Sequence, residues 1–92
     1  MAHSRSAKKR VRQNERRRLR NRVARSALRS AVKRFRAAVS AGDLATARAI
    51  YAIIQKRADT IARKGIIPAK RAARIKSRLA AALGSAPAPA AT

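Results

Sequence analysis

Cysteine is absent from this 92-residue chain, and histidine and acidic residues are scarce. The absence of cysteine excludes disulfides, cysteine-bound zinc and thiol catalysis. The single His3 and three acids that lie far apart in the sequence are too few for a Ser-His-Asp triad, a two-carboxylate hydrolase site or a carboxylate metal cage. We therefore predict that the protein is not an enzyme and that it binds no metal or other cofactor.

Aromatic residues and long apolar runs are also scarce. Phe35 and Tyr51 are the only aromatic residues, which is too few for a base-stacking surface of the RRM or OB kind. No apolar run approaches the ~20 residues of a membrane span. The N-terminus is charged from Arg5 onward and lacks the apolar segment of a secretory signal. The expected location is the cytoplasm, and we expect no membrane partner, no small-molecule substrate and no homo-oligomer.

Positive charge, in contrast, is abundant. Lys and Arg number 25 against 3 Asp and Glu, which gives a net charge of +22. A charge of this size opposes compaction through self-repulsion, and a bound polyanion would relieve it. Residues 1–36 carry a net +14, residues 37–62 carry +1 and residues 63–83 carry +7. The charge therefore belongs to the first and last of these segments. The nearly neutral middle segment is expected to leave one side of the domain relatively free of a nucleic-acid partner.

Glycine and proline are few, and their positions divide the chain. Alanine, arginine, lysine and leucine are strong helix formers and dominate the sequence. Gly42 followed by Asp43 predicts a helix end and the N-cap of the next helix, and Pro68 suits a first helical position. These breaks predict helices at about residues 7–41, 44–64 and 68–83. Residues 84–92 (GSAPAPAAT) are expected to form a disordered tail.

Apolar residues recur every three or four positions within each predicted helix, as a bundle requires. The stripes consist of Ala24, Ala27, Leu28, Ala31, Val32, Phe35, Ala38 and Val39, then Ala47, Ile50, Tyr51, Ile54, Ala58 and Ile61, then Ala72, Ile75, Leu79, Ala82 and Leu83. Short loops make successive helices antiparallel. We predict an all-α fold, an antiparallel three-helix bundle over residues 23–83. Ile67 would be the N-cap of the third helix, although it has no side-chain acceptor.

The first helix is longer than its apolar stripe. Between Arg5 and Arg22 only Val11 and Leu19 are large and apolar, and they fall on nearly opposite faces. At ~1.5 Å per residue the helix would span about 50 Å, roughly twice the bundled length. Residues 1–22 should therefore project as a basic arm. We expect the arm to be frayed or disordered in the free protein, because like charges at i,i+4 destabilise an isolated helix.

Basic side chains surround the arm when they are placed at ~100° per residue. A helix lying on a membrane would be basic on one face only, so the pattern favours insertion between several phosphate backbones. A disordered basic tail with no fixed site is the alternative. In the third helix, Arg71, Arg74 and Arg78 form a stripe. With Lys64 and Lys70 this stripe predicts a second phosphate-facing surface, for which a merely solvated helix face is the alternative.

Three blocks of sequence form a recognisable series. The first is SAKKR at residues 6–10, continuing with basic and amide residues to Asn21. The second is AGD at residues 41–43, and the third is KGII at residues 64–67, followed by basic residues up to Leu79. In this order and at this spacing the blocks resemble the S-twenty family of bacterial small-ribosomal-subunit proteins, over about residues 4–83.

The resemblance implies a bundle that binds small-subunit ribosomal RNA directly and early in assembly, with its extended first helix wedged into the RNA. The implied contacts are the 5′ domain and the long stem near the 3′ end, with other ribosomal proteins touched only marginally. Relatives usually carry His-Lys-Asn where this chain has Pro68-Ala69-Lys70, so the polar start of that helix is missing. The predicted RNA-binding residues are Ser6, Lys8, Lys9, Arg10, Arg12, Gln13, Arg16, Arg17, Arg18, Arg20, Asn21, Arg22, Arg25, Lys64, Lys70, Arg71, Arg74, Lys76, Ser77 and Arg78.

A DNA-compacting protein of the nucleoid type is the alternative function, since the charge alone permits it. Against it, the sequence shows no helix-turn-helix elements and no sign of the dimerisation that pairs two half-sites on duplex DNA.

Overall fold

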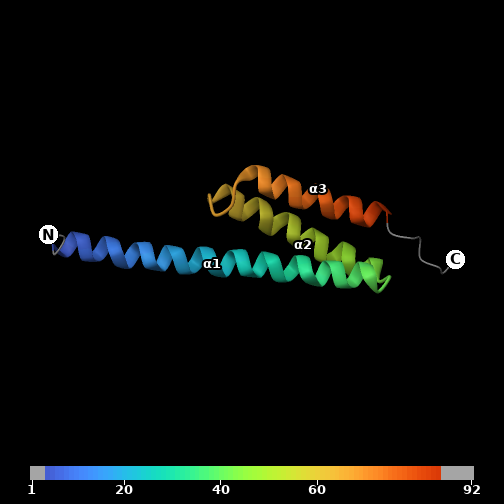
Figure 1. Cartoon of the computed structure of the whole chain (residues 1–92), viewed down its shortest axis with the longest axis horizontal. Helices are drawn as coiled ribbons and strands as arrows, with labels where there is room; N and C mark the ends of the chain where they lie inside the picture. Colours follow the sequence, from blue (N-terminus) through green and yellow to red (C-terminus); the bar gives the residue numbers. More distant parts are fainter. Residues whose placement is uncertain (1–3, 86–92) are drawn as a thin grey trace.

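Three helices make up the part of the chain that the structure describes. A computed structural model describes residues 4–85. The helices are α1 (Arg5–Ser40), α2 (Leu44–Arg63) and α3 (Ala69–Ser85). They run antiparallel in succession, and α2 and α3 cover only the C-terminal half of α1 (Figure 1). The predicted all-α, three-helix fold with a projecting first helix is confirmed.

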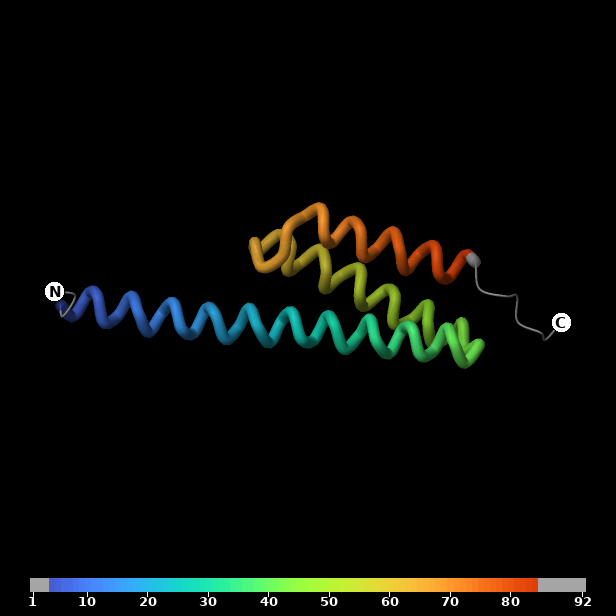
Figure 2. The backbone as a smooth tube through the Cα atoms, viewed as in Figure 1, coloured from blue at the N-terminus to red at the C-terminus, as the bar shows by residue number. Residues whose placement is uncertain are grey.

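The molecule is elongated because α1 continues alone beyond the bundle. Its dimensions are 70 × 21 × 15 Å. Figure 2 shows the N-terminal half of α1 extending past the turn between α2 and α3, with no other part of the described chain beside it. Both α1 and α3 pack mainly against α2. The arrangement therefore leaves an open groove between α1 and α3, which is lined by residues of both helices.

The core lies between the C-terminal half of α1 and the other two helices. Its largest fully buried side chains are Phe35, Ile54 and Leu79, one from each helix. The rings of Phe35 and Tyr51 pack against each other with their centroids 6.1 Å apart. Every residue of the predicted stripes is buried or partly buried. The core is thin because many of its members are alanines.

Ile67 corrects one expectation. It was expected to be the N-cap residue of the third helix, but α3 begins at Ala69 and the Pro68 carbonyl accepts its first hydrogen bonds. The Ile67 side chain is instead buried in the core. Ile66 packs against the same cluster. The two isoleucines lie in the connection between α2 and α3, and the fold brings this connection over α1. The residue types around a helix end do not show that Ile67 is buried against the other helices.

Both inter-helix turns are built on a left-handed glycine. Gly42 and Gly65 each have φ +78°, a conformation that glycine adopts at little cost. At the second turn the Ile66 N–H donates to the Ile61 carbonyl at 2.9 Å and the Gly65 N–H donates to the Ala62 carbonyl at 3.0 Å. This pair of hydrogen bonds is the Schellman motif. It fixes the direction in which the chain leaves α2.

The helix ends differ from the predicted boundaries by one or two residues. α1 begins earlier than predicted because the Ser4 hydroxyl accepts a hydrogen bond from the Ala7 N–H at 3.1 Å and so caps the helix. The arm was expected to be frayed or disordered in the free protein, but from Arg5 onward the structure describes it as part of this continuous helix. α3 begins at Ala69, after Pro68, and continues through Gly84 to Ser85. Gly84 and Ser85 were predicted to belong to the disordered tail, but they are the last two residues of this helix. Residues 1–3, which include His3, and residues 86–92 lie outside the described part of the chain.

Polar contacts hold α2 to α3. The Tyr51 hydroxyl donates to the Lys76 carbonyl at 3.1 Å, and the Lys76 ammonium donates to Asp59 Oδ1 at 2.7 Å. The Lys76 and Asp59 side chains are 31% and 47% exposed, so their ion pair contributes little stability. Its main consequence is that an acid already neutralises the Lys76 charge.

Asp43 caps α2 as predicted. Its carboxylate accepts hydrogen bonds from the Thr46 hydroxyl at 2.6 Å and from the Thr46 N–H at 3.2 Å. These hydrogen bonds, the hydroxyl one first, hold the pKa of Asp43 below its ordinary value of 3.8. A carboxylate whose pKa is lower in the folded state stabilises the fold above the unfolded pKa, and the contribution is lost as the pH falls through the folded pKa.

The Asp43→Asn variant tests this cap. Asparagine keeps an acceptor oxygen at the cap position but does not titrate. We expect the thermal midpoint of the natural protein to exceed that of the variant at neutral pH. The excess should shrink as the pH falls from about 5 to about 2, as followed by circular dichroism. A constant difference between the two midpoints over this range would contradict the assigned role.

Candidate nucleic-acid interface

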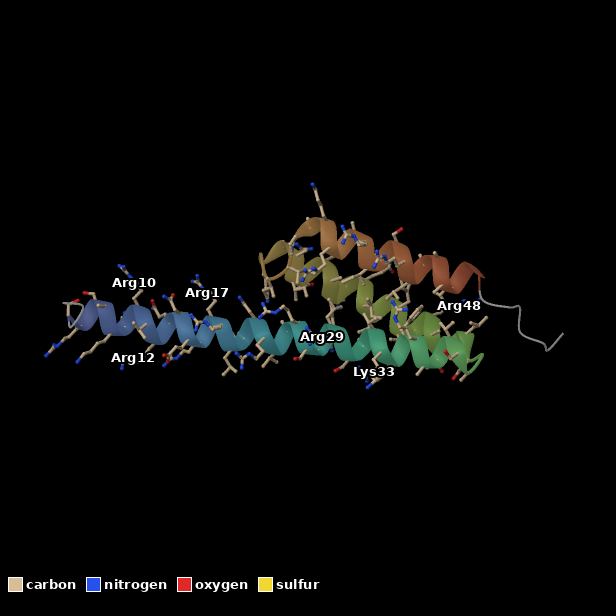
Figure 3. The ribbon with its side chains drawn as sticks, in the orientation of Figure 1. Arg10, Arg12, Arg17, Arg29, Lys33 and Arg48 are labelled. Carbon is tan, nitrogen blue, oxygen red and sulfur yellow. The ribbon has the colours of Figure 1, made fainter. Side chains whose placement is uncertain are left out.

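The arm makes almost no contact with the rest of the protein. Every residue from Ser4 to Arg20 is exposed except Ala7, which is partly buried. Even its two large apolar residues are open to solvent, with Val11 55% and Leu19 60% exposed. In Figure 3 the side chains of Arg10 and Arg17 rise on one side of α1 and that of Arg12 lies on the opposite side. The arm therefore presents cations in several directions.

A cleft forms where the arm leaves the bundle, and we call it the junction cleft. One wall is α1, and the other is the end of α2 with the turn that follows. The cleft brings together six of the predicted RNA-binding residues, and it is lined by Gln13, Arg16, Arg17, Arg20, Asn21, Ala24, Ile61, Lys64 and Ile66. Lys64 is far from the arm in the sequence, so only the fold places its charge beside the arm arginines.

A second concave surface runs between α1 and α3, and we call it the arginine groove. Its apolar floor includes Leu28, Val32 and Ile75. Arginines from both helices line its edges: Arg25, Arg29 and Arg36 from α1, and Arg71, Arg74 and Arg78 from α3. The fold thus joins the predicted α3 stripe to a matching row on α1.

Arg29 and Arg36 were not among the predicted site residues. With Arg25 and Val32 they follow spacings of three and four along α1, beside the apolar stripe that enters the core. This spacing was the signal that could have found them.

The remaining predicted residues lie outside these two concave surfaces. Lys70 and Ser77 are exposed on α3, and Lys76 is paired with Asp59. The geometry favours a structural role for Lys76 over an RNA contact. The other members belong to the exposed surface of α1, namely Ser6, Lys8, Lys9, Arg10, Arg12, Arg18 and Arg22.

The cations of the interface have no acidic partners within the described chain. The one ion pair among residues 4–85 joins Lys76 to Asp59. Over the same residues no cluster of three His, Asp or Glu side chains could hold a metal. No helix in the described part has the length and apolar character needed to cross a membrane. The arm, the junction cleft and the arginine groove together form a surface of unpaired charge suited to phosphate groups.

Known proteins resemble this chain over nearly its whole length. The family described as Ribosomal protein S20 matches residues 2–84. A small ribosomal subunit protein bS20 of Shewanella pealeana is 52% identical over 79 residues, which is 86% of this chain and 90% of the relative. The protein of the same name from Clostridium beijerinckii is 44% identical over 85 residues, 92% of this chain and 98% of the relative. By these matches the chain belongs to the ribosomal protein S20 family.

Proposed function

We propose that the protein is a structural, non-enzymatic component of the cytoplasmic small ribosomal subunit, that it binds ribosomal RNA directly, and that it supports early subunit assembly. The family membership supports the ribosomal role. The observation that carries direct RNA binding is the arrangement of charge. Unpaired arginines follow α1 from the arm into the arginine groove, with a second row on α3.

The proposed mechanism is phosphate neutralisation combined with ordering of the arm. If about eight phosphates are neutralised, log K should fall by roughly 6–7 units per decade of salt. Residues 4–20 of the arm make almost no contact with the bundle, so bound RNA supplies the counter-charge that this part of the helix lacks. We propose that the arm inserts between RNA segments of the 5′ domain and the long stem near the 3′ end. Specificity comes from RNA shape more than from base edges.

A charge-matched pair of variants tests the arginine groove. The first variant replaces Arg71, Arg74 and Arg78 with Gln. The control replaces Arg48, Lys56 and Arg57 with Gln, which removes the same charge from exposed positions of α2. We expect the groove variant to lose at least about tenfold in affinity for small-subunit ribosomal RNA and about two units of salt slope. The control should change much less, in filter-binding titrations at several salt concentrations.

Equal losses in the two variants would contradict the assignment of the groove. They would mean that total charge, and not its placement along α1 and α3, determines the affinity.

A further inference from the structure

The junction cleft differs in chemistry from the rest of the basic surface. Its floor is apolar, formed by Ala24, Ile61 and Ile66, and its rim carries two amide side chains, Gln13 and Asn21, among the cations. Phosphate binding alone requires neither an apolar floor nor amides. The arginine groove, for comparison, has no amide among its lining residues.

Core packing and a backbone hydrogen bond hold the floor of the cleft in place. Ile61 is 7% exposed and belongs to the core. Ile66 is fixed by the hydrogen bond from its N–H to the Ile61 carbonyl at 2.9 Å. On the opposite wall, Asn21 is the one residue from Lys8 to Val23 that is partly buried. These contacts give the corner a defined shape before any ligand binds.

We propose that the junction cleft receives a single unpaired RNA nucleotide. Its base rests on Ile61 and Ile66, Asn21 and Gln13 hydrogen-bond its edge, and the flanking phosphates lie against the arginines and Lys64. Amides both donate and accept, so they can pair with a base edge. This inference rests on the proposed RNA-binding function and names the RNA feature that the corner recognises.

A paired duplex offers the junction cleft fewer base contacts than an unpaired nucleotide does. In an A-form helix the base faces are stacked on one another, the major groove is too deep and narrow for side chains, and the shallow minor groove is recognised mainly by shape. Unpaired bases, in contrast, can be splayed out and hydrogen-bonded. The cleft volume of about 810 Å³ is within the usual range for sites that enclose a small ligand. The open arginine groove is the better match for a continuous phosphate backbone.

Three kinds of RNA hairpin with equal numbers of phosphates test the proposal on the full-length chain. One is fully paired, one carries a single bulged nucleotide with each of the four bases in turn, and one carries an abasic bulge. We expect at least one bulged hairpin to bind about tenfold more tightly than the paired and the abasic hairpins, as two or three neutral hydrogen bonds and base burial would give. 2-Aminopurine in the bulge should change its fluorescence on binding.

Two single substitutions test whether the preference for the bulge arises in the junction cleft. Asn21→Ala should remove most of the preference for the bulge, so that the bulged hairpin binds this variant no more tightly than the paired hairpin does. The matched control is Gln55→Ala, which removes an exposed amide of α2 outside the cleft and should keep the preference. Circular dichroism verifies that both variants fold, and alanine favours the helix at both positions.

The possible failures are distinguishable. Equal binding of paired, bulged and abasic hairpins, all tighter than duplex DNA, would overturn the nucleotide site and leave RNA binding in place. Retention of the full bulge preference by Asn21→Ala would also overturn the site. If no hairpin binds more tightly than duplex DNA of equal length, the proposed function fails together with it.

Discussion

The Ile54→Asp variant is expected to be unfolded at neutral pH. Ile54 is 0% exposed and lies in the core beside residues of the other two helices. A carboxylate at this position would be a buried charge with no partner, which costs on the order of 4 kcal/mol or more. A domain of this size has a free energy of unfolding on the order of 5 kcal/mol. With its many alanines the core has little other packing to offset the loss.

The neighbouring residue provides the matched control. Ile53 is 48% exposed on the same helix, so Ile53→Asp makes the same chemical change at a solvent-accessible position. We expect Ile53→Asp to keep the helical circular dichroism signal and a cooperative thermal transition, and Ile54→Asp to lose both. A folded Ile54→Asp protein would show that the core has been placed incorrectly.

Deletion of residues 1–21 is expected to abolish RNA binding without unfolding the bundle. The deleted segment holds nine of the chain's basic residues and the α1 wall of the junction cleft apart from Ala24. It contributes no residue to the core cluster. We therefore expect the thermal midpoint to stay within about 5 °C of the original, which for a small domain corresponds to less than about 1 kcal/mol.

A full-length variant separates loss of charge from loss of the segment. Changing Arg16, Arg17, Arg18 and Arg20 to Gln keeps the helix length and its propensity. It should weaken RNA binding strongly and lower the salt slope by up to about three to four units. If the deletion melts the bundle, the arm is part of the folded domain, and the division at residue 22 is wrong.

The helices and the core could be predicted because their signals are local. Spacings of three and four placed Phe35, Ile54 and Leu79 on the apolar faces, and burial of all three confirms this. The glycines at positions 42 and 65 marked the turns, since a left-handed residue is required at both. The boundary at Gly84 was wrong because a glycine favours a helix end without forcing one, and α3 runs through it.

The shape of the interface could not be predicted because it depends on contacts between distant segments. The junction cleft needs Lys64 beside the arm, and the arginine groove needs α3 to lie along Arg29 and Arg36. The pairing of Lys76 with Asp59 spans two helices and 17 residues, so no helical spacing shows it. The sequence predicts which residues share one face of a helix. Which faces of different helices lie against each other can be seen only in the three-dimensional structure.

The most direct test of the account is a competition titration with the full-length protein. Small-subunit ribosomal RNA competes against duplex DNA of equal phosphate content at physiological salt. We expect a preference for the RNA of at least about a hundredfold, because a shaped surface adds specificity to the charge. Equal affinity for the two would contradict it. The charge would then bind polyanions without discrimination, and a DNA-compacting role would be the better description.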